Sequence, residues 1–137
     1  MPQRTVTLNY DKANPDAPFG PAPRRISVEP NDTIQFEIGA STLAAHQGCK
    51  LRITFHKEQH FSEKVLQHKG AQKGSEALAV TVKPGLAAAL PALRAQAKPV
   101  ITGYKCELLD ANGQPIPGLE SDGPAGGEVV PDTASGN

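Results

Sequence analysis

The stretch RRISVEPNDTIQFEIG, residues 24–39, decides how the rest of the chain is interpreted. Apolar and polar residues alternate on both sides of its centre, and a period of two is typical of strands with one buried face. The central VEPND has the Pro, Asn and Asp of a turn, so the stretch predicts a hairpin over 25–39. The predicted inward side chains are Ile26, Val28, Ile34, Phe36 and Ile38.

The same period of two recurs in four other segments. RTVTLNY (4–10), CKLRITFHK (49–57), ALAVTVKPG (77–85) and VITGYKCELLD (100–110) each indicate a strand. QPIPGL (114–119) indicates an edge strand, because its two Pro residues cannot donate hydrogen bonds to a neighbour. Several short strands separated by turns predict an all-β fold, a single antiparallel β-sandwich of about seven strands.

Helix and irregular structure occupy the remainder. The Ala- and Leu-rich segment after residue 85 predicts at most one short helix near 92–97, with Pro91 at its first position. Residues 120–137 are rich in Gly, Pro and small polar residues and predict a flexible tail. We therefore expect a β-sandwich domain over 1–119 followed by this tail.

Composition limits the classes of function. The net charge is +0, with 14 basic and 14 acidic residues, so no basic field favours nucleic acid or an anionic membrane. The first ten residues lack the apolar segment of a secretory signal, and no apolar run could span a bilayer. The sequence thus predicts a cytoplasmic protein, and its zero charge leaves little repulsion between copies.

The two cysteines, Cys49 and Cys106, fall on inward faces of two predicted strands. Two interpretations stay open: a pair of small buried hydrophobic side chains, or a disulfide between strands. Tyr104 shares the inward face of Cys106. The expected reducing compartment favours free thiols.

The strand order over 25–113, with its Tyr-x-Cys step, resembles the cupredoxin-like and immunoglobulin-like sandwiches. The immunoglobulin resemblance implies a Cys49–Cys106 bridge between sheets and places Tyr104 at the tyrosine corner. A cupredoxin copper site needs a His and usually a Met after its Cys. Here all four His residues precede Cys106 and the only methionine is Met1, so the copper ligands are missing.

The segment FHKEQHF, residues 55–61, contains a candidate metal site. If the strand before it continues, His56, Glu58 and His60 share one face, and two imidazoles with a carboxylate can bind zinc or copper. If the segment is helical instead, His56 and His60 lie one turn apart, which also suits a metal ion. The alternative is an ordinary solvated surface that holds no metal. No other cofactor is indicated.

Three carboxylates, Asp122, Glu29 and Asp110, are candidate catalytic groups, although residues of this type near turns are more often turn formers. The Val28-Glu29-Pro30 step and the late GGEVVPD (126–132) resemble the DP-EP family of small bacterial β-sandwich proteins. That resemblance implies self-assembly and an aspartic-type self-cleavage near the C-terminus. The chain contains no Asp-Pro step.

Three hypotheses follow for the function. The leading one is a β-sandwich that acts through self-association or protein binding, as a homo-oligomer, because sandwich edges are open and net charge is zero. The alternative is a self-processing endopeptidase that cuts its own C-terminal region between residues 110 and 132. The third is a metal-binding module that uses His56, Glu58 and His60.

Overall fold

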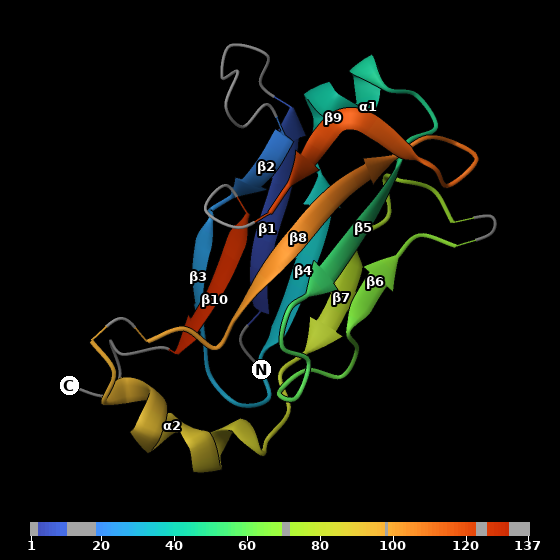
Figure 1. The fold of residues 1–137 in the computed structure, drawn as a ribbon. Helices are drawn as coiled ribbons and strands as arrows, with labels where there is room; N and C mark the ends of the chain where they lie inside the picture. The colour runs from blue at the N-terminus through green and yellow to red at the C-terminus, as the bar shows by residue number, and fades with distance from the viewer. Residues whose placement is uncertain (1–2, 11–18, 70–71, 98, 123–125, 132–137) are drawn as a thin grey trace.

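Ten strands and two helices make up the part of the chain that the computed structural model describes, residues 3–10, 19–69, 72–97, 99–122 and 126–131. The fold is therefore mostly β, as predicted (Figure 1). The elements are β1 (Gln3–Tyr10), β2 (Phe19–Ala22), β3 (Arg25–Val28), β4 (Thr33–Ile38), α1 (Ala40–Ala45), β5 (Lys50–Phe55), β6 (Val65–Gln67), β7 (Leu78–Thr81), α2 (Leu86–Arg94), β8 (Thr102–Leu109), β9 (Pro115–Ser121) and β10 (Gly127–Pro131).

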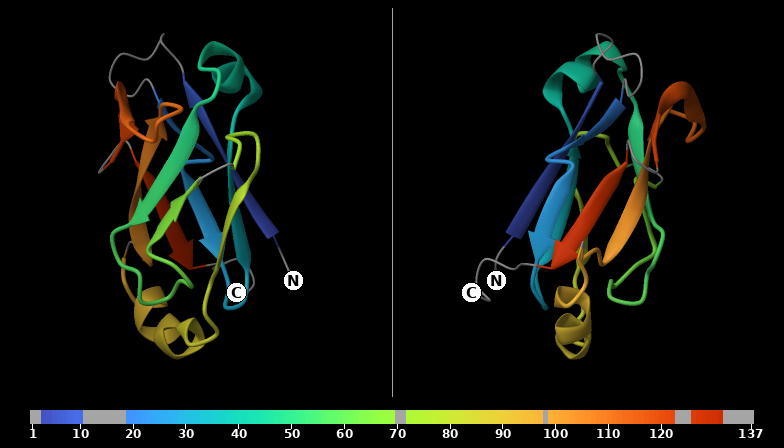
Figure 2. Two further views of the ribbon diagram at one scale, coloured as in Figure 1. Left: turned by 90° about the vertical axis from the view of Figure 1, so that its right-hand side faces the viewer. Right: turned by 60° about the vertical axis from the view of Figure 1, so that its left-hand side comes forward.

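The strands form two sheets that lie face to face (Figure 2). Sheet A has the order β2-β1-β4-β7, and sheet B has the order β3-β10-β8-β5-β6, with β9 paired to β8. The pairs β1–β4 and β3–β10 are parallel and the others are antiparallel. The prediction of a single antiparallel sandwich of about seven strands is thus corrected in two respects. The described residues form ten strands, and two of the strand pairs are parallel.

The predicted hairpin over 25–39 is wrong, because its two arms belong to different sheets. β3 pairs with β10 in sheet B, whereas β4 pairs with β1 and β7 in sheet A. The turn between them holds Asn31 at a φ of 73°, and the Asp32 carboxylate accepts a hydrogen bond from the Glu29 N–H at 2.9 Å. The local pattern gave the correct inward faces but could not reveal the partner strands.

The core lies between the sheets and confirms the predicted alternation. Phe36 from sheet A meets Tyr104 from sheet B, with ring centroids 5.2 Å apart in an edge-to-face arrangement. Phe55 lies 5.9 Å from Tyr104 and stacks on Phe61 at 4.6 Å. Edge-to-face and stacked rings contribute beyond their buried area, so these rings tie sheet A to sheet B.

The helices cap opposite ends of the sheets (Figure 1). The short α1 was not predicted. The second, α2, begins at Leu86 rather than near residue 92, and Pro91 lies inside it. The reason is packing: Leu86 and Leu90 are both buried, and a four-residue spacing brings them to one face only if the helix already begins at Leu86.

The predicted flexible tail contains strand structure. Ser121 ends β9, and Gly127–Pro131 forms β10 in the interior of sheet B, between β3 and β8. Val129 is fully buried and belongs to the core. Only two apolar side chains, Val129 and Val130, stand among Gly and Pro residues here, and two adjacent apolar residues give no alternation, which explains why β10 was missed. The rest of the tail, residues 123–125 and 132–137, lies outside the described residues.

Candidate functional site

Sheet edges are where a β fold can accept another strand, because the outer N–H and C=O groups of an edge strand have no neighbour. β2 contains Pro21 and β9 contains Pro115 and Pro117, which reduce the donors available on those strands. β3 presents the Arg25–Glu128 ion pair, 3.0 Å long. These three strands are therefore poor acceptors of a further strand.

The edge of β7 is covered at its end by the chain around residue 62. The Ser62 N–H donates to the Thr81 carbonyl at 2.9 Å, and the Thr81 N–H donates to Ser62 Oγ at 3.1 Å. The Lys83 N–H donates to the His60 carbonyl at 2.8 Å. This contact satisfies the outer groups of Thr81 and Lys83.

The hydrogen bonds of β6 to β5 determine which of its groups face outward. The Phe55 N–H donates to the Lys64 carbonyl at 2.9 Å, and the His68 N–H donates to the Leu51 carbonyl at 3.3 Å. Antiparallel strands alternate, so every second residue turns its N–H and C=O toward the neighbour. The residues of β6 that face β5 are therefore Lys64, Leu66 and His68.

Val65 and Gln67 turn their main-chain groups away from β5, toward the open edge. Within the part of the chain that the structure describes, neither residue has a hydrogen-bond partner on that side. Val65 is also 41% exposed, and among the described residues it is the only large hydrophobic side chain that is exposed. The β6 edge therefore combines free strand donors and acceptors with an exposed apolar side chain, and its described strand contains no Pro.

A groove runs along this edge, between β6 and β7. Its volume is about 280 Å³, and it is lined by both strands together with Glu63 and Lys69. Its apolar lining residues are Val65, Leu66, Ala77, Leu78 and Ala79. The two sheets thus leave a narrow space beside the unpaired groups of Val65 and Gln67.

His68 fixes the end of β6. Its Nδ1 accepts a hydrogen bond from the Leu51 N–H at 3.0 Å, and its Nε2 lies 2.7 Å from the Glu76 carbonyl. A nitrogen facing a carbonyl must carry the proton, so the imidazole is neutral and protonated at Nε2. The side chain is 1% exposed and replaces one strand hydrogen bond, which holds β6 against β5.

A charged row crosses the outer face of sheet B beside β6. In the strand register Gln67 lies opposite Arg52, and Arg52 lies opposite Glu107. Glu107 in turn lies opposite Glu120 of β9. Arg52 Nε donates to Glu107 Oε1 at 2.9 Å, and this hydrogen bond holds the pKa of the Glu107 carboxyl below its usual value. Lys105 lies 3.5 Å from Glu120, so the row is balanced in charge up to the β6 edge.

The candidate metal ligands are not arranged as predicted, because β5 ends at Phe55 and the strand does not continue. His56 Nε2 instead lies 2.7 Å from Asp122 Oδ1, and His60 Nε2 lies 3.1 Å from Gln59 Nε2. No three His, Cys, Asp or Glu side chains gather as metal ligands within the described ranges. Glu58 is exposed.

The three candidate carboxylates lie at separate places. Asp122 contacts His56, and both side chains are about half exposed. Asp110 lies beyond the end of β8, where its Oδ1 accepts hydrogen bonds from the Asn112 and Gln114 N–H groups at 2.9 and 3.0 Å. Glu29 begins the turn that leads to β4. Asp110 thus acts as a turn former, as residues of this type commonly do.

Cys49 and Cys106 are both free and buried. Both belong to the same side of the sandwich, because Cys49 directly precedes β5 and Cys106 pairs with Ile53 of β5, four residues along the chain from Cys49. Four residues of strand span about 13 Å, which is beyond the reach of a disulfide. The bridge between sheets that the immunoglobulin resemblance implied is therefore wrong. Burial raises the pKa of Cys106 to about 12, so its thiol stays protonated at neutral pH.

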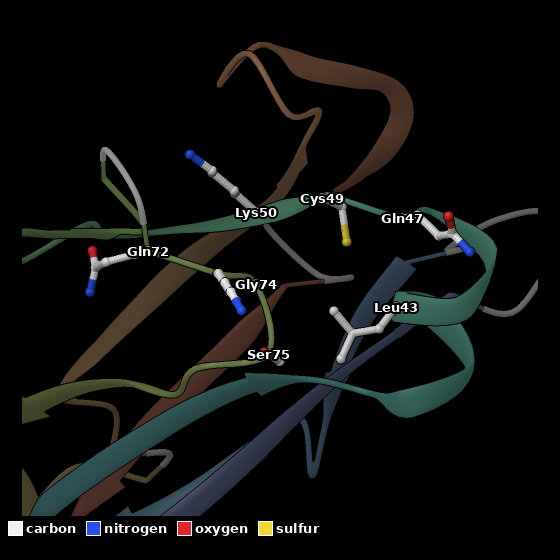
Figure 3. Close-up of a pocket in the computed structure, with 9 residues that line it drawn as sticks. Leu43, Gln47, Cys49, Lys50, Gln72, Gly74 and Ser75 are labelled. Carbon is white, nitrogen blue, oxygen red and sulfur yellow. The ribbon is translucent and has the colours of Figure 1, made fainter.

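A larger cavity of about 460 Å³ lies where α1 meets the turn around residue 74 (Figure 3). Figure 3 shows the Cys49 sulfur pointing toward Leu43 while Lys50 extends away from it. Gly74 packs so closely on the Cys49 carbonyl that no side chain fits there. No sequence motif predicts this cavity, since its walls come from segments more than twenty residues apart.

Comparisons of the chain with protein-family models, with curated proteins and with solved structures gave no match. None of the helices in the described ranges is long and apolar enough to cross a membrane. The candidate site therefore stands on the geometry of the chain alone.

Proposed function

We propose that this protein is an interaction module that binds an extended protein segment along the outer edge of β6. The observation that carries the proposal is the outward direction of the Val65 and Gln67 main-chain groups beside an exposed Val65 side chain. Addition of a strand to an open edge is a common mode of peptide recognition, in which main-chain hydrogen bonds supply affinity.

The location follows from the state of the other edges. Pro residues occupy β2 and β9, an ion pair lies on β3, and residues 60–62 cover the end of β7. The partner strand therefore meets the fewest obstacles at β6. The edge is short and buries little area, so we expect weak, concentration-dependent association. Because the net charge is zero, electrostatic repulsion opposes this association little.

Light scattering across a range of protein concentration tests the proposal. The unaltered chain is expected to grow in mean mass with concentration, whereas Val65→Lys and Gln67→Pro remain monomeric. Pro at position 67 removes an outward N–H without touching a bond to β5. Thr5→Lys, an exposed strand position on sheet A, is the matched control and should associate normally. Equal masses for all four proteins would refute the proposal.

A second candidate function is cleavage of the chain's own C-terminal region, and it rests on the His56–Asp122 pair. An imidazole 2.7 Å from a carboxylate can move a proton, and this pair lies where β9 ends. Intact mass after long incubation at mildly acidic pH tests it. A cut between residues 110 and 132 that is lost in Asp122→Asn and in His56→Gln supports it, and an intact chain rejects it.

A further inference from the structure

We infer that the segment bound at the β6 edge is the β6 edge of a second copy of this chain, antiparallel, with the two Val65 residues opposite each other. This inference rests on the proposed function, since it names the partner of the same edge. It joins sheet B of one copy to sheet B of the other in one continuous sheet.

The alternation of inward and outward main-chain groups along β6 permits this pairing. Val65 turns both its N–H and its C=O outward, so two copies related by a two-fold axis can exchange both bonds at this position. In the same register Gln67 lies opposite Glu63 of the second copy. All outward groups of Val65 and Gln67 then obtain partners.

The side chains also favour this register. Val65 lies on the outer face of sheet B beside Thr54, and pairing buries it against its copy. A β-branched pair across strands stabilises a sheet, whereas like charges opposite each other destabilise it. Here Glu63 faces the neutral Gln67 and Lys64 faces Leu66, so no like charges meet. The surface is thus self-complementary, which is what a two-fold interface requires.

One competing register centres on Leu66 and places Glu63 opposite Lys69 of the second copy. Its ion pair is solvent-exposed and contributes little. The main chain of Lys69 is already engaged, because its N–H donates to Gln72 Oε1 at 2.8 Å and its carbonyl accepts from the Gln72 N–H at 3.0 Å. That register therefore loses strand bonds and leaves Val65 opposite the polar Gln67.

Disulfide trapping distinguishes the two registers. A Val65→Cys variant of the full chain, held in a glutathione redox buffer, should form a covalent dimer, since opposite Cα atoms in a hydrogen-bonded pair lie about 5.5 Å apart. Gln67→Cys alone should not, but mixed with Glu63→Cys it should. The native Cys49 and Cys106 are 2% and 0% exposed and do not compete. Thr5→Cys serves as the control for random collision.

The outcomes separate this inference from the proposed function. Covalent dimer of Val65→Cys at several times the Thr5→Cys yield supports the register. Preferential cross-linking of Val65→Cys with Gln67→Cys, or a Val65→Cys yield equal to the control, overturns it. In that case light scattering tests whether the unaltered chain associates. If it associates and Val65→Lys does not, strand addition at β6 stands and only the register is wrong. An unaltered chain that stays monomeric would reject both.

Discussion

Arg52 and Glu107 form a two-bond ion pair across β5 and β8, with Nε–Oε1 and Nη2–Oε2 distances of 2.9 and 3.0 Å. Their Cα atoms are direct partners in the strand register. The Glu107 side chain is 9% exposed, so solvent screens this pair less than an ordinary surface pair. The pair links β8 to β5, and β5 is the strand that pairs with β6.

Glu107→Gln is expected to lower the free energy of unfolding at neutral pH by about 1–2 kcal/mol, because a charge-assisted bidentate contact becomes neutral. The pKa of Glu107 is lowered in the folded state, so the pair's stability is present above the ordinary carboxyl pKa and is lost as pH falls through the folded value. Urea unfolding at pH 7, 4 and 3 checks this. The difference in free energy of unfolding between the variant and the parent protein should become smaller as the pH falls. Glu120→Gln, 55% exposed, is the control and should change little.

Gly127→Ala is expected to destabilise the protein by at least about 2 kcal/mol, because a Cβ at this position would overlap the Tyr104 ring. The two residues are strand partners, so the ring lies directly over the glycine. The cost should be much smaller in a Tyr104→Ala background, although that background is itself less stable. A double-mutant cycle by chemical unfolding measures the coupling, and additive costs would show that the ring is not the obstacle.

Tyr104→Phe is expected to be neutral or to raise the free energy of unfolding by up to about 1 kcal/mol. The hydroxyl is buried and has no hydrogen-bond partner among the described residues, so its removal relieves a desolvation cost. Burial also raises the pKa of Tyr104, so the hydroxyl stays protonated at neutral pH. A loss above about 1 kcal/mol in thermal or urea unfolding would indicate that the hydroxyl does have a partner.

His68→Ala is expected to cost about 2–4 kcal/mol, since it removes a buried side chain and leaves the Leu51 N–H and the Glu76 carbonyl without their partner. Because this contact secures β6, hydrogen exchange of the β5–β6 amides should rise more than that of β1. His46→Ala, an alteration at a partly exposed histidine outside the strands, is the comparison. Uniform exchange across both sheets would contradict a local role.

Both cysteine thiols are expected to resist a thiol reagent in the native protein and to react at once in denaturant. Burial raises the pKa of Cys49, and it raises that of Cys106 to about 12, so neither supplies thiolate near pH 7. Counting free thiols before and after unfolding checks this. A disulfide-linked pair in the native chain would instead show two protons missing by intact mass.

Local pattern sufficed for much of the fold. The alternation at Ile34, Phe36 and Ile38 predicted their burial correctly, because the side-chain period of a strand is set by its own backbone. The interpretation of Asp110 as a turn former was also correct, since its Oδ1 accepts hydrogen bonds from the Asn112 and Gln114 N–H groups. The candidate site was only partly foreseen: open edges were expected, but β6 lies outside the segments in which the pattern predicted strands.

What the sequence determined by itself is which residues turn inward, the near-absence of net charge, and the absence of copper ligands after Cys106. Only the tertiary structure decided three features. Residues 25–39 divide between two sheets, Cys49 directly precedes a strand of the sheet that holds Cys106, and β10 joins the sheet interior. The physical reason is that side-chain alternation is a local property, whereas strand partners depend on contacts between distant residues. The open edge of β6 is such a consequence, since an edge exists only where no other strand has paired.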